Sequence, residues 1–196
     1  MRSYYWLCPK GYKDESIAYA PEGTPLSHYL IDSVKDLDEL PFSLTLHDVK
    51  ITDSIKIGPI SNAEPIDYVA NSLAWPIMSE RMKSIIDSGL NGNEGLRWLS
   101  VRIMGLTKVF KYYIPVFTVY LDTIDRDKTI YSDKEREWMV KPYYKAEEVN
   151  KYAVFHENEQ VFWQITTGIY VRSDIMKRMK SEGITGISHS CKALLV

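Results

Sequence analysis

The fold is decided by residues 79–89, SERMKSIIDSG, which have the pattern of a short amphipathic helix. The hydroxyl of Ser79 can accept from the unpaired amides of the first turn, where the helix dipole also favours the negative charge of Glu80. Three apolar residues at i, i+3 and i+4 then share one face, which we expect to be buried: Met82, Ile85 and Ile86. We expect Gly89 to end the helix in the left-handed conformation.

A second helix is predicted at residues 173–183, SDIMKRMKSEG. Ser173 is the expected cap, Asp174 lies in the first turn, and Gly183 is the expected terminator. The predicted buried stripe consists of Ile175, Met176 and Met179. The basic residues of this segment cluster toward its end, where cations complement the helix dipole, so they need no further explanation.

Between the two helices the sequence is rich in β-branched and aromatic residues, which favour strands. The candidates are residues 98–103, 109–113, 116–124, 152–155 and 161–166, with shorter ones at 168–171 and 193–196. Because these strands follow one another without intervening helices, we expect one antiparallel sheet. A mainly antiparallel sheet flanked by a few helices is an α+β fold.

The sequence pattern changes near residue 65. Before that point short apolar pieces alternate with Pro and Gly, which is typical of short strands and loops. A chain of 196 residues with 14 Tyr and 5 Trp is long and apolar enough for one well-packed domain. We therefore expect a single domain over 1–196, with an annex of short strands and loops at 1–64 and an α+β core at 65–196.

The composition gives no electrostatic footprint for nucleic acid. The chain has 24 Lys and Arg against 26 Asp and Glu, so its formal net charge is −2. Domains that bind DNA or RNA normally carry a basic stripe or a strongly basic balance. We expect no nucleic acid partner, although the acids outnumber the bases in residues 1–64, where an acidic face is possible.

The sequence favours a cytoplasmic protein. No stretch reaches the roughly 18 apolar residues of a membrane-spanning helix, so we expect no membrane association. The first eight residues, MRSYYWLC, are followed by Pro9 and lack the apolar run and cleavage site of a signal peptide. The two cysteines, Cys8 and Cys191, fit reduced thiols, with a bridge between the chain ends as the alternative.

No metal-binding or cofactor-binding pattern is recognisable. The four histidines lack the i, i+4 spacing that places two ligands on one helix face: they are His28, His47, His156 and His189. The glycines of residues 89–95 lack the lysine of a P-loop and the preceding strand of a dinucleotide fingerprint. We expect no metal and no cofactor.

Two arrangements could carry catalysis. His189 lies two residues from the thiol of Cys191, which is the spacing of a possible base and nucleophile, but no orienting carboxylate is near in the sequence. Asp122 and Asp125 could act as paired carboxylates, although the cations that follow them favour a polar end to a strand. We expect no enzymatic activity and keep an uncharacterised enzyme as an alternative.

Residues 133–145, DKEREWMVKPYYK, are the best candidate for partner binding. This segment places Trp138, Tyr143 and Tyr144 among alternating charges, and such rings dominate the energetic centres of protein interfaces. The alternative is that Trp138 and one tyrosine pack this connection onto the sheet. If the exposed rings paired with those of a second copy, the chain would instead be a homodimer.

Several of these segments together resemble a family of bacterial immunity proteins. The similar segments are residues 75–86, WPIMSERMKSII, the strands from Trp98 onward, residues 168–179, GIYVRSDIMKRM, and the turn GITGI at 183–187. The resemblance covers residues 65–190 approximately. The chain departs from the family pattern at 188–190, where an acidic residue is typical, and at Arg172.

Immunity proteins of this kind are encoded beside secreted polymorphic toxins and protect against them. The resemblance therefore implies a non-catalytic protein that binds a cognate toxin and blocks its active site or the entry to it. Its motifs are helix caps and core positions, which report a shared fold more than a particular partner.

Overall fold

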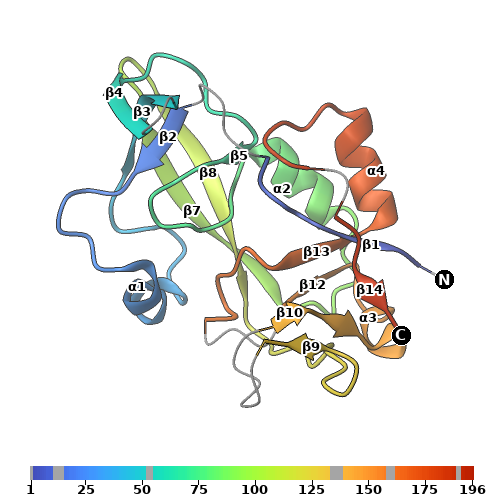
Figure 1. Ribbon diagram of the computed structural model, residues 1–196. Helices are drawn as coiled ribbons and strands as arrows, with labels where there is room; N and C mark the ends of the chain where they lie inside the picture. Colours follow the sequence, from blue (N-terminus) through green and yellow to red (C-terminus); the bar gives the residue numbers. More distant parts are fainter. Residues whose placement is uncertain (1, 11–15, 52–54, 133–138, 158–161, 189–190) are drawn as a thin grey trace.

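The computed structural model describes residues 2–10, 16–51, 55–132, 139–157, 162–188 and 191–196 (Figure 1). Within these ranges the chain forms four helices and several small sheets, so the expected α+β class is confirmed. The largest sheet lies at the left of Figure 1, and the helices α2 and α4 lie at the right above a smaller sheet. Both ends of the chain lie beside this smaller sheet.

The largest sheet has seven strands in the order β2-β3-β7-β8-β6-β5, with β4 paired to β3. Its long members are antiparallel except for the parallel pair β3 and β7. The strands are β2 (Ser16–Tyr19), β3 (Leu44–Ile51), β4 (Ile55–Ile60), β5 (Tyr68–Val69), β6 (Ile77–Met78), β7 (Leu96–Met104) and β8 (Val109–Phe117). The first 64 residues thus contribute three strands to the same sheet as the later β7 and β8.

The smaller sheet has three antiparallel strands in the order β1-β13-β12. They are β1 (Tyr4–Trp6), β12 (Val154–His156) and β13 (Ile169–Arg172), so the first strand of the chain pairs with the last third. The helices α2 (Glu80–Asp87) and α4 (Ser173–Ser181) share a core with this sheet.

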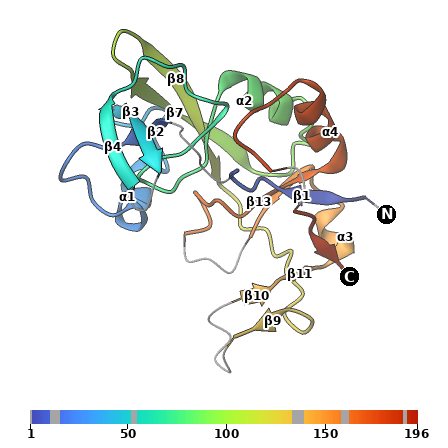
Figure 2. The same ribbon diagram turned by 45° about the horizontal axis from the view of Figure 1, so that its top comes forward.

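Two short ribbons and two further helices complete the described chain. β9 (Ile130–Tyr131) pairs with β10 (Met139–Lys141), and β11 (Tyr143–Tyr144) pairs in parallel with β14 (Leu194–Leu195). The helices are α1 (Ser27–Val34) and α3 (Ala146–Val149). Figure 2 shows the β9–β10 ribbon projecting below the rest of the molecule.

The helix predicted at residues 79–89 is confirmed as α2. The Ser79 hydroxyl accepts from the Met82 amide at 3.2 Å, and the three expected apolar residues are buried. The predicted role of Gly89 is wrong, because Gly89 does not have a positive φ. A Cβ at Gly89 would lie 2.6 Å from Cγ1 of Ile175, so this glycine allows α2 and α4 to approach closely.

The second predicted helix is confirmed as α4, with Ile175, Met176 and Met179 buried and Gly183 at φ +68°. Ser173, however, is the first helical residue and not the cap. Arg172 occupies the cap position, and its guanidinium binds the carboxylate of Asp174 at 2.7 Å and the carbonyl of Gly89 at 3.2 Å. The residue that departs from the family pattern therefore joins the start of α4 to the end of α2.

Three expectations about the strands and the N-terminal third are wrong. The strands form separate sheets instead of one, because β12 and β13 pair with β1 and not with β7 and β8. The predicted strands 109–113 and 116–124 are one strand that ends at Phe117, and residues 162–166 form turns. The first third also contains α1, whose start has neither a capping side chain nor an acid to indicate it.

Candidate partner-binding surface

Two of the segments that carry the family resemblance, 75–86 and 183–187, meet at the carboxylate of Asp67, which lies just before β5. Its Oδ1 accepts from the Ser79 hydroxyl at 2.6 Å, and its Oδ2 accepts from Arg81 at 2.9 Å. The same Oδ2 accepts from the amide and the hydroxyl of Thr185, both at 2.9 Å. We call these four residues the Asp67 node.

The Asp67 node serves the fold. Burial tends to raise the pKa of Asp67, but hydrogen bonds from Ser79, Thr185 and Arg81 outweigh it, so the pKa lies below its usual value. The adjoining Gly186 has φ +84°, and a Cβ there would lie 2.6 Å from the Tyr68 carbonyl oxygen. The motifs at the start of α2 and after α4 therefore hold these two elements against β5.

The structure describes two of the three predicted partner-binding residues, and these two differ in burial. Trp138 lies outside the described residues. Tyr144 is fully buried, and its ring lies about 5 Å from the rings of Phe155 and Tyr170. Tyr143 is half-buried, and the Lys141 ammonium lies 5.4 Å from its ring. The alternation of the strand separates the two tyrosines, so Tyr144 belongs to the core and Tyr143 to its edge.

Exposed apolar residues accompany Tyr143. Ile130 of β9 and Val140 of β10 are at least half exposed, and Leu194 pairs with Tyr143 across the β11–β14 ribbon. We call these four residues the ribbon surface. Val140 and Tyr143 belong to the predicted segment, whereas Ile130 and Leu194 lie outside it.

A second exposed surface was not predicted from the sequence. His28 at the start of α1 contacts the ring of Tyr29 at 3.9 Å between centroids and that of Phe162 at 5.4 Å. Trp163 then lies 5.6 Å from Tyr120, edge to face. Tyr29 is 70% exposed, and Tyr120 and Phe162 are also exposed. We call these five residues the aromatic surface.

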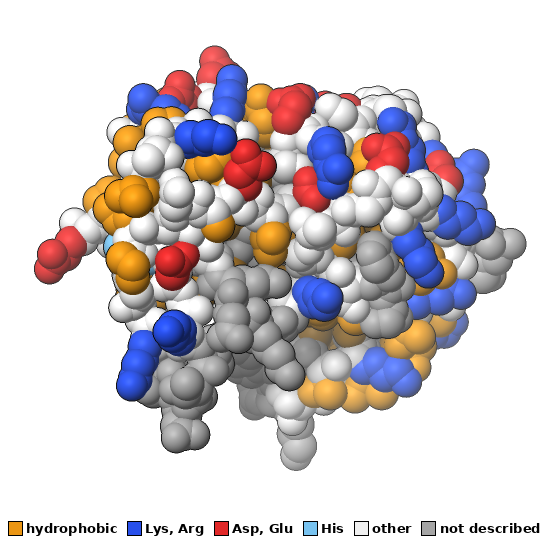
Figure 3. All heavy atoms as spheres, turned by 90° about the horizontal axis from the view of Figure 1, so that it is seen from above, with side chains coloured by type: hydrophobic (Ala, Val, Ile, Leu, Met, Phe, Trp, Pro, Cys, Tyr) orange, Lys and Arg blue, Asp and Glu red, His pale blue; other side chains and the backbone are white. Residues whose placement is uncertain are grey.

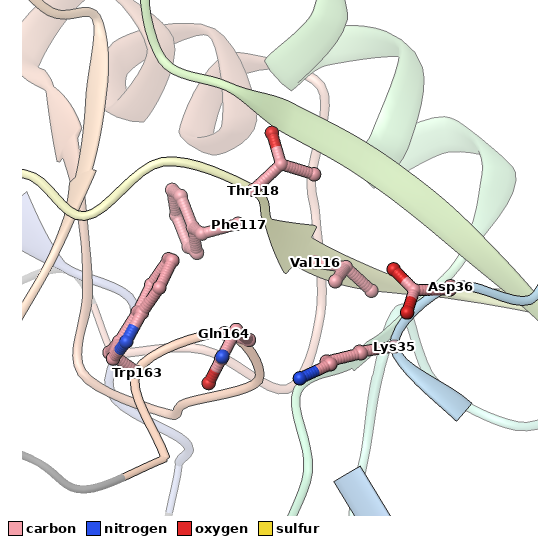
Figure 4. Close-up of a pocket in the computed structure, with 7 residues that line it drawn as sticks. All are labelled: Lys35, Asp36, Val116, Phe117, Thr118, Trp163 and Gln164. Carbon is pink, nitrogen blue, oxygen red and sulfur yellow. The ribbon is translucent and has the colours of Figure 1, made fainter. Parts of the chain in front are cut away.

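A pocket of about 220 Å³ adjoins the aromatic surface (Figure 4). In Figure 4, Lys35 and Asp36 lie on one side of it and Trp163 on the other, with the end of β8 behind them. The Phe117 amide donates to the Gln164 carbonyl at 2.8 Å, which ties the β12–β13 connection to β8. The pocket is open, and Lys35 and Asp36 are the charged residues in its lining. It can therefore receive a protruding side chain of a partner protein.

Buried His156 supports the aromatic surface from inside. Its ring stacks on Trp163 at 5.2 Å, and its Nε2 lies 3.3 Å from the Leu121 amide. Burial lowers the pKa of His156, and the nearby carbonyls of Glu157 and Val119, which favour the protonated ring, oppose this effect. The histidine is therefore held neutral at physiological pH.

Acidic residues surround the α1 side of the aromatic surface. Asp32, Asp36, Asp38 and Glu39 are exposed on α1 and the turn that follows it. Lys35 pairs with Asp32 at 2.8 Å, and Arg102 pairs with Glu39 at 2.9 Å. The rim of this surface therefore carries more negative than positive charge, as the composition of the first 64 residues suggests.

The molecule exposes another apolar group at the far end of the sheet. It consists of Ile60, Met104, Leu106 and Val109 at the β7–β8 turn, and we call it the hairpin-tip cluster. Figure 3, which views the molecule from above, shows hydrophobic side chains gathered at the left edge, on the side of β2, β3 and β4. This cluster has no aromatic residue, and aliphatic residues contribute less often to interface energetics than Tyr and Trp.

Both aspartates that were candidates for catalysis make local structural contacts in the described part of the chain. Asp122 pairs with Arg126 at 2.8 Å, and the Asp125 carboxylate accepts from the amides of Asp127 and Lys128. His189 lies outside the described residues. No group of three His, Cys, Asp or Glu side chains in the described ranges could hold a metal ion.

A family model for the Immunity protein family (Imm11) matches residues 29–191. No curated protein matches the chain. Among the described residues, no helix combines the length and the apolar character needed to cross a bilayer. The match includes the Asp67 node and most of the aromatic surface. Since it covers more than half of the chain, the protein belongs to the Imm11 immunity protein family.

Proposed function

We propose that this protein neutralises a cognate bacterial toxin by binding it, without catalysing a reaction. The observation that carries the proposal is the family match over residues 29–191. A scaffold held by the Asp67 node supports it, because a rigid surface loses little conformational freedom on binding. We propose the bacterial cytoplasm as the place of action, where two unpaired cysteines are ordinary.

We propose the aromatic surface as the centre of the toxin interface. Tyrosine and tryptophan supply large contact areas with few rotatable bonds, and they dominate the binding energy of many interfaces. The neighbouring pocket offers space for a side chain of the toxin. The acidic rim favours a toxin surface with Lys or Arg around an apolar centre, and such complementarity also speeds association.

The ribbon surface, with Tyr143, is proposed as the edge of the same interface. In Figures 1 and 2 the described part of the β12–β13 connection, which carries Phe162, runs between α1 and the β9–β10 ribbon. A standard interface buries about 1,200–2,000 Å² in total, which is wide enough to include both surfaces. The proposal for Trp138 rests on the sequence alone.

Binding would neutralise the toxin by covering its active site. This mechanism requires stoichiometric association, because each immunity protein must stay bound to its toxin. Slow dissociation matters more than fast encounter for lasting protection, and a well-packed aromatic centre acts mainly on dissociation.

The test is to purify the full chain and the toxin encoded by an adjacent gene and to titrate one against the other. We expect a 1:1 complex by size-exclusion chromatography with light scattering, and complete loss of toxin activity at equimolar protein. An active toxin at equimolar protein contradicts the proposal. Inactivation by a small fraction of one equivalent would instead indicate an enzyme, and a stable complex of two copies without toxin would indicate a homodimer.

A further inference from the structure

The two ends of the chain pair with each other beside the three-stranded sheet. The Trp6 amide donates to the Cys191 carbonyl at 2.8 Å, and the Ser188 amide donates to the Cys8 carbonyl at 2.8 Å. Antiparallel bridges also join Tyr5 to Lys192 and Pro9 to Ile187. Both cysteines of the protein are therefore held in one short antiparallel pairing.

The backbone pairing brings the two cysteines close to each other. Cys191 is hydrogen-bonded through its backbone to Trp6, and Cys8 is hydrogen-bonded through its backbone to Ser188, so the two cysteines lie diagonally across the pairing. The thiol of Cys8 donates to the Pro9 carbonyl at 3.6 Å. Both cysteines are half-buried and unbridged.

A surface pocket gives small molecules access to Cys191, one member of this pair. The pocket has a volume of about 130 Å³, and Trp6, Tyr170 and Lys192 line it together with Cys191. A lining that includes aromatic rings and one lysine can accommodate a small molecule with carboxylate groups. Burial, followed by the nearby Cys191, raises the pKa of Cys8, so its thiol is protonated at neutral pH and reacts slowly.

We propose that Cys8 and Cys191 form a redox-active dithiol, which a low-molecular-weight disulfide oxidises to a bond between the two ends of the chain. One cysteine, as thiolate, attacks a sulfur of the small disulfide and forms a mixed disulfide, which releases one small thiol. The second cysteine attacks the protein sulfur of that mixed disulfide and releases the other small thiol. Two protons and two electrons pass from the protein to the small disulfide, which becomes two thiols.

A disulfide between Cys8 and Cys191 would change the stability of the protein more than its shape. It closes a loop that contains almost the whole chain, and loops of that length lose the most entropy from the unfolded state. It would also fix the segment that leads from Cys191 into β14, which pairs with β11 and contributes Leu194 to the ribbon surface. The oxidised protein is therefore expected to resist heat and proteolysis at its ends better than the reduced protein.

The test uses the full chain, reduced and then incubated with oxidised glutathione. We expect loss of both titratable thiols, a mass lower by two hydrogens, and a cross-linked peptide that contains Cys8 and Cys191. The melting temperature should rise by about 5–15 °C and return to its initial value on reduction. Cys8→Ser and Cys191→Ser should take up one glutathione each and show no such rise.

The control for folding is the far-ultraviolet circular dichroism of the reduced wild type and of both serine variants, which should coincide. Two stable glutathione adducts on the wild type, or a disulfide between two chains, would overturn the proposal. An intramolecular disulfide that leaves the melting temperature unchanged would also overturn the proposal, because the bond would then add nothing to the stability of the fold.

Discussion

The Asp67 node and the aromatic surface differ in how completely their side chains are buried and bonded within the protein. Both carboxylate oxygens of Asp67 accept hydrogen bonds, and the residue is almost inaccessible to water. At the aromatic surface, Tyr29, Tyr120 and Phe162 leave a large part of their rings exposed. The node is complete by itself, whereas the surface gains contact area only from a partner.

This difference shows why the family motifs do not identify the partner. The motifs around Ser79 and Thr185 are recognisable because capping and turn formation require particular residues at particular positions. The rings of the aromatic surface come from three distant segments, and no spacing rule connects them. The family motifs therefore identify the scaffold of the protein. The interface can be located only from the folded structure.

The largest effect is expected from Asp67→Ala. This change leaves Arg81, the Ser79 hydroxyl and the Thr185 amide without their acceptor, which should lower the free energy of unfolding by about 3–4 kcal/mol. Urea denaturation measures the loss. Asp32→Ala, which breaks an exposed ion pair, is the control and should change stability by less than about 0.5 kcal/mol. An equal loss of unfolding free energy in Asp67→Ala and Asp32→Ala would show that the Asp67 node is no more important for stability than an exposed ion pair.

The next effect is expected in binding and not in stability. Tyr29→Ala removes an exposed ring, so we expect an unchanged urea midpoint and a dissociation constant for the toxin raised by about 30-fold, or about 2 kcal/mol. Calorimetry or surface plasmon resonance measures the affinity. Leu106→Ala, in the hairpin-tip cluster, is the matched control. A larger loss for Leu106→Ala than for Tyr29→Ala would move the interface to the other end of the sheet.

A smaller effect is expected on the stability of the protein when the pH is lowered. Because the folded pKa of His156 is lowered, the unfolded state binds more protons below the ordinary histidine pKa of about 6.5, and stability should fall as pH decreases from there. Melting temperatures between pH 7.5 and pH 5, in steps of about half a unit, measure this slope. His156→Gln should be less stable at pH 7 but have a flatter profile. The same slope in both proteins would exclude His156 as its source.

The smallest effect is expected from Tyr143→Ala at the proposed edge of the interface. Residues at the rim contribute little because water still reaches them, so the affinity for the toxin should fall by less than about fivefold. The same affinity measurement as for Tyr29→Ala applies. A loss greater than that of Tyr29→Ala would place the ribbon surface at the centre of the interface.

The sequence predicts local features of this fold well and pairing between distant segments poorly. Both helices with caps or terminal glycines were found, and their buried stripes are correct. α1 was missed because its start lacks such signals, although it buries Leu30, Ile31 and Val34. The division into separate sheets depends on β1 pairing with β13, which are far apart in the sequence and carry no common pattern.

The candidate site was predicted only in part for the same reason. The sequence could not tell which of the adjacent Tyr143 and Tyr144 is buried, because that depends on which face of a two-residue strand meets the core. It could not find the aromatic surface, because His28, Tyr120 and Phe162 meet only after folding. The role of Gly89 was also hidden, since a close approach of α4 does not appear in the local sequence.

The most direct test of the central claim is amide hydrogen exchange of the full chain with and without its toxin. The account predicts slower exchange on binding at residues 26–34, 118–121 and 162–168, and little change at the hairpin-tip cluster or at residues 183–187. Protection confined to residues 56–60 and 104–109, with none at α1 or the β12–β13 connection, would contradict it.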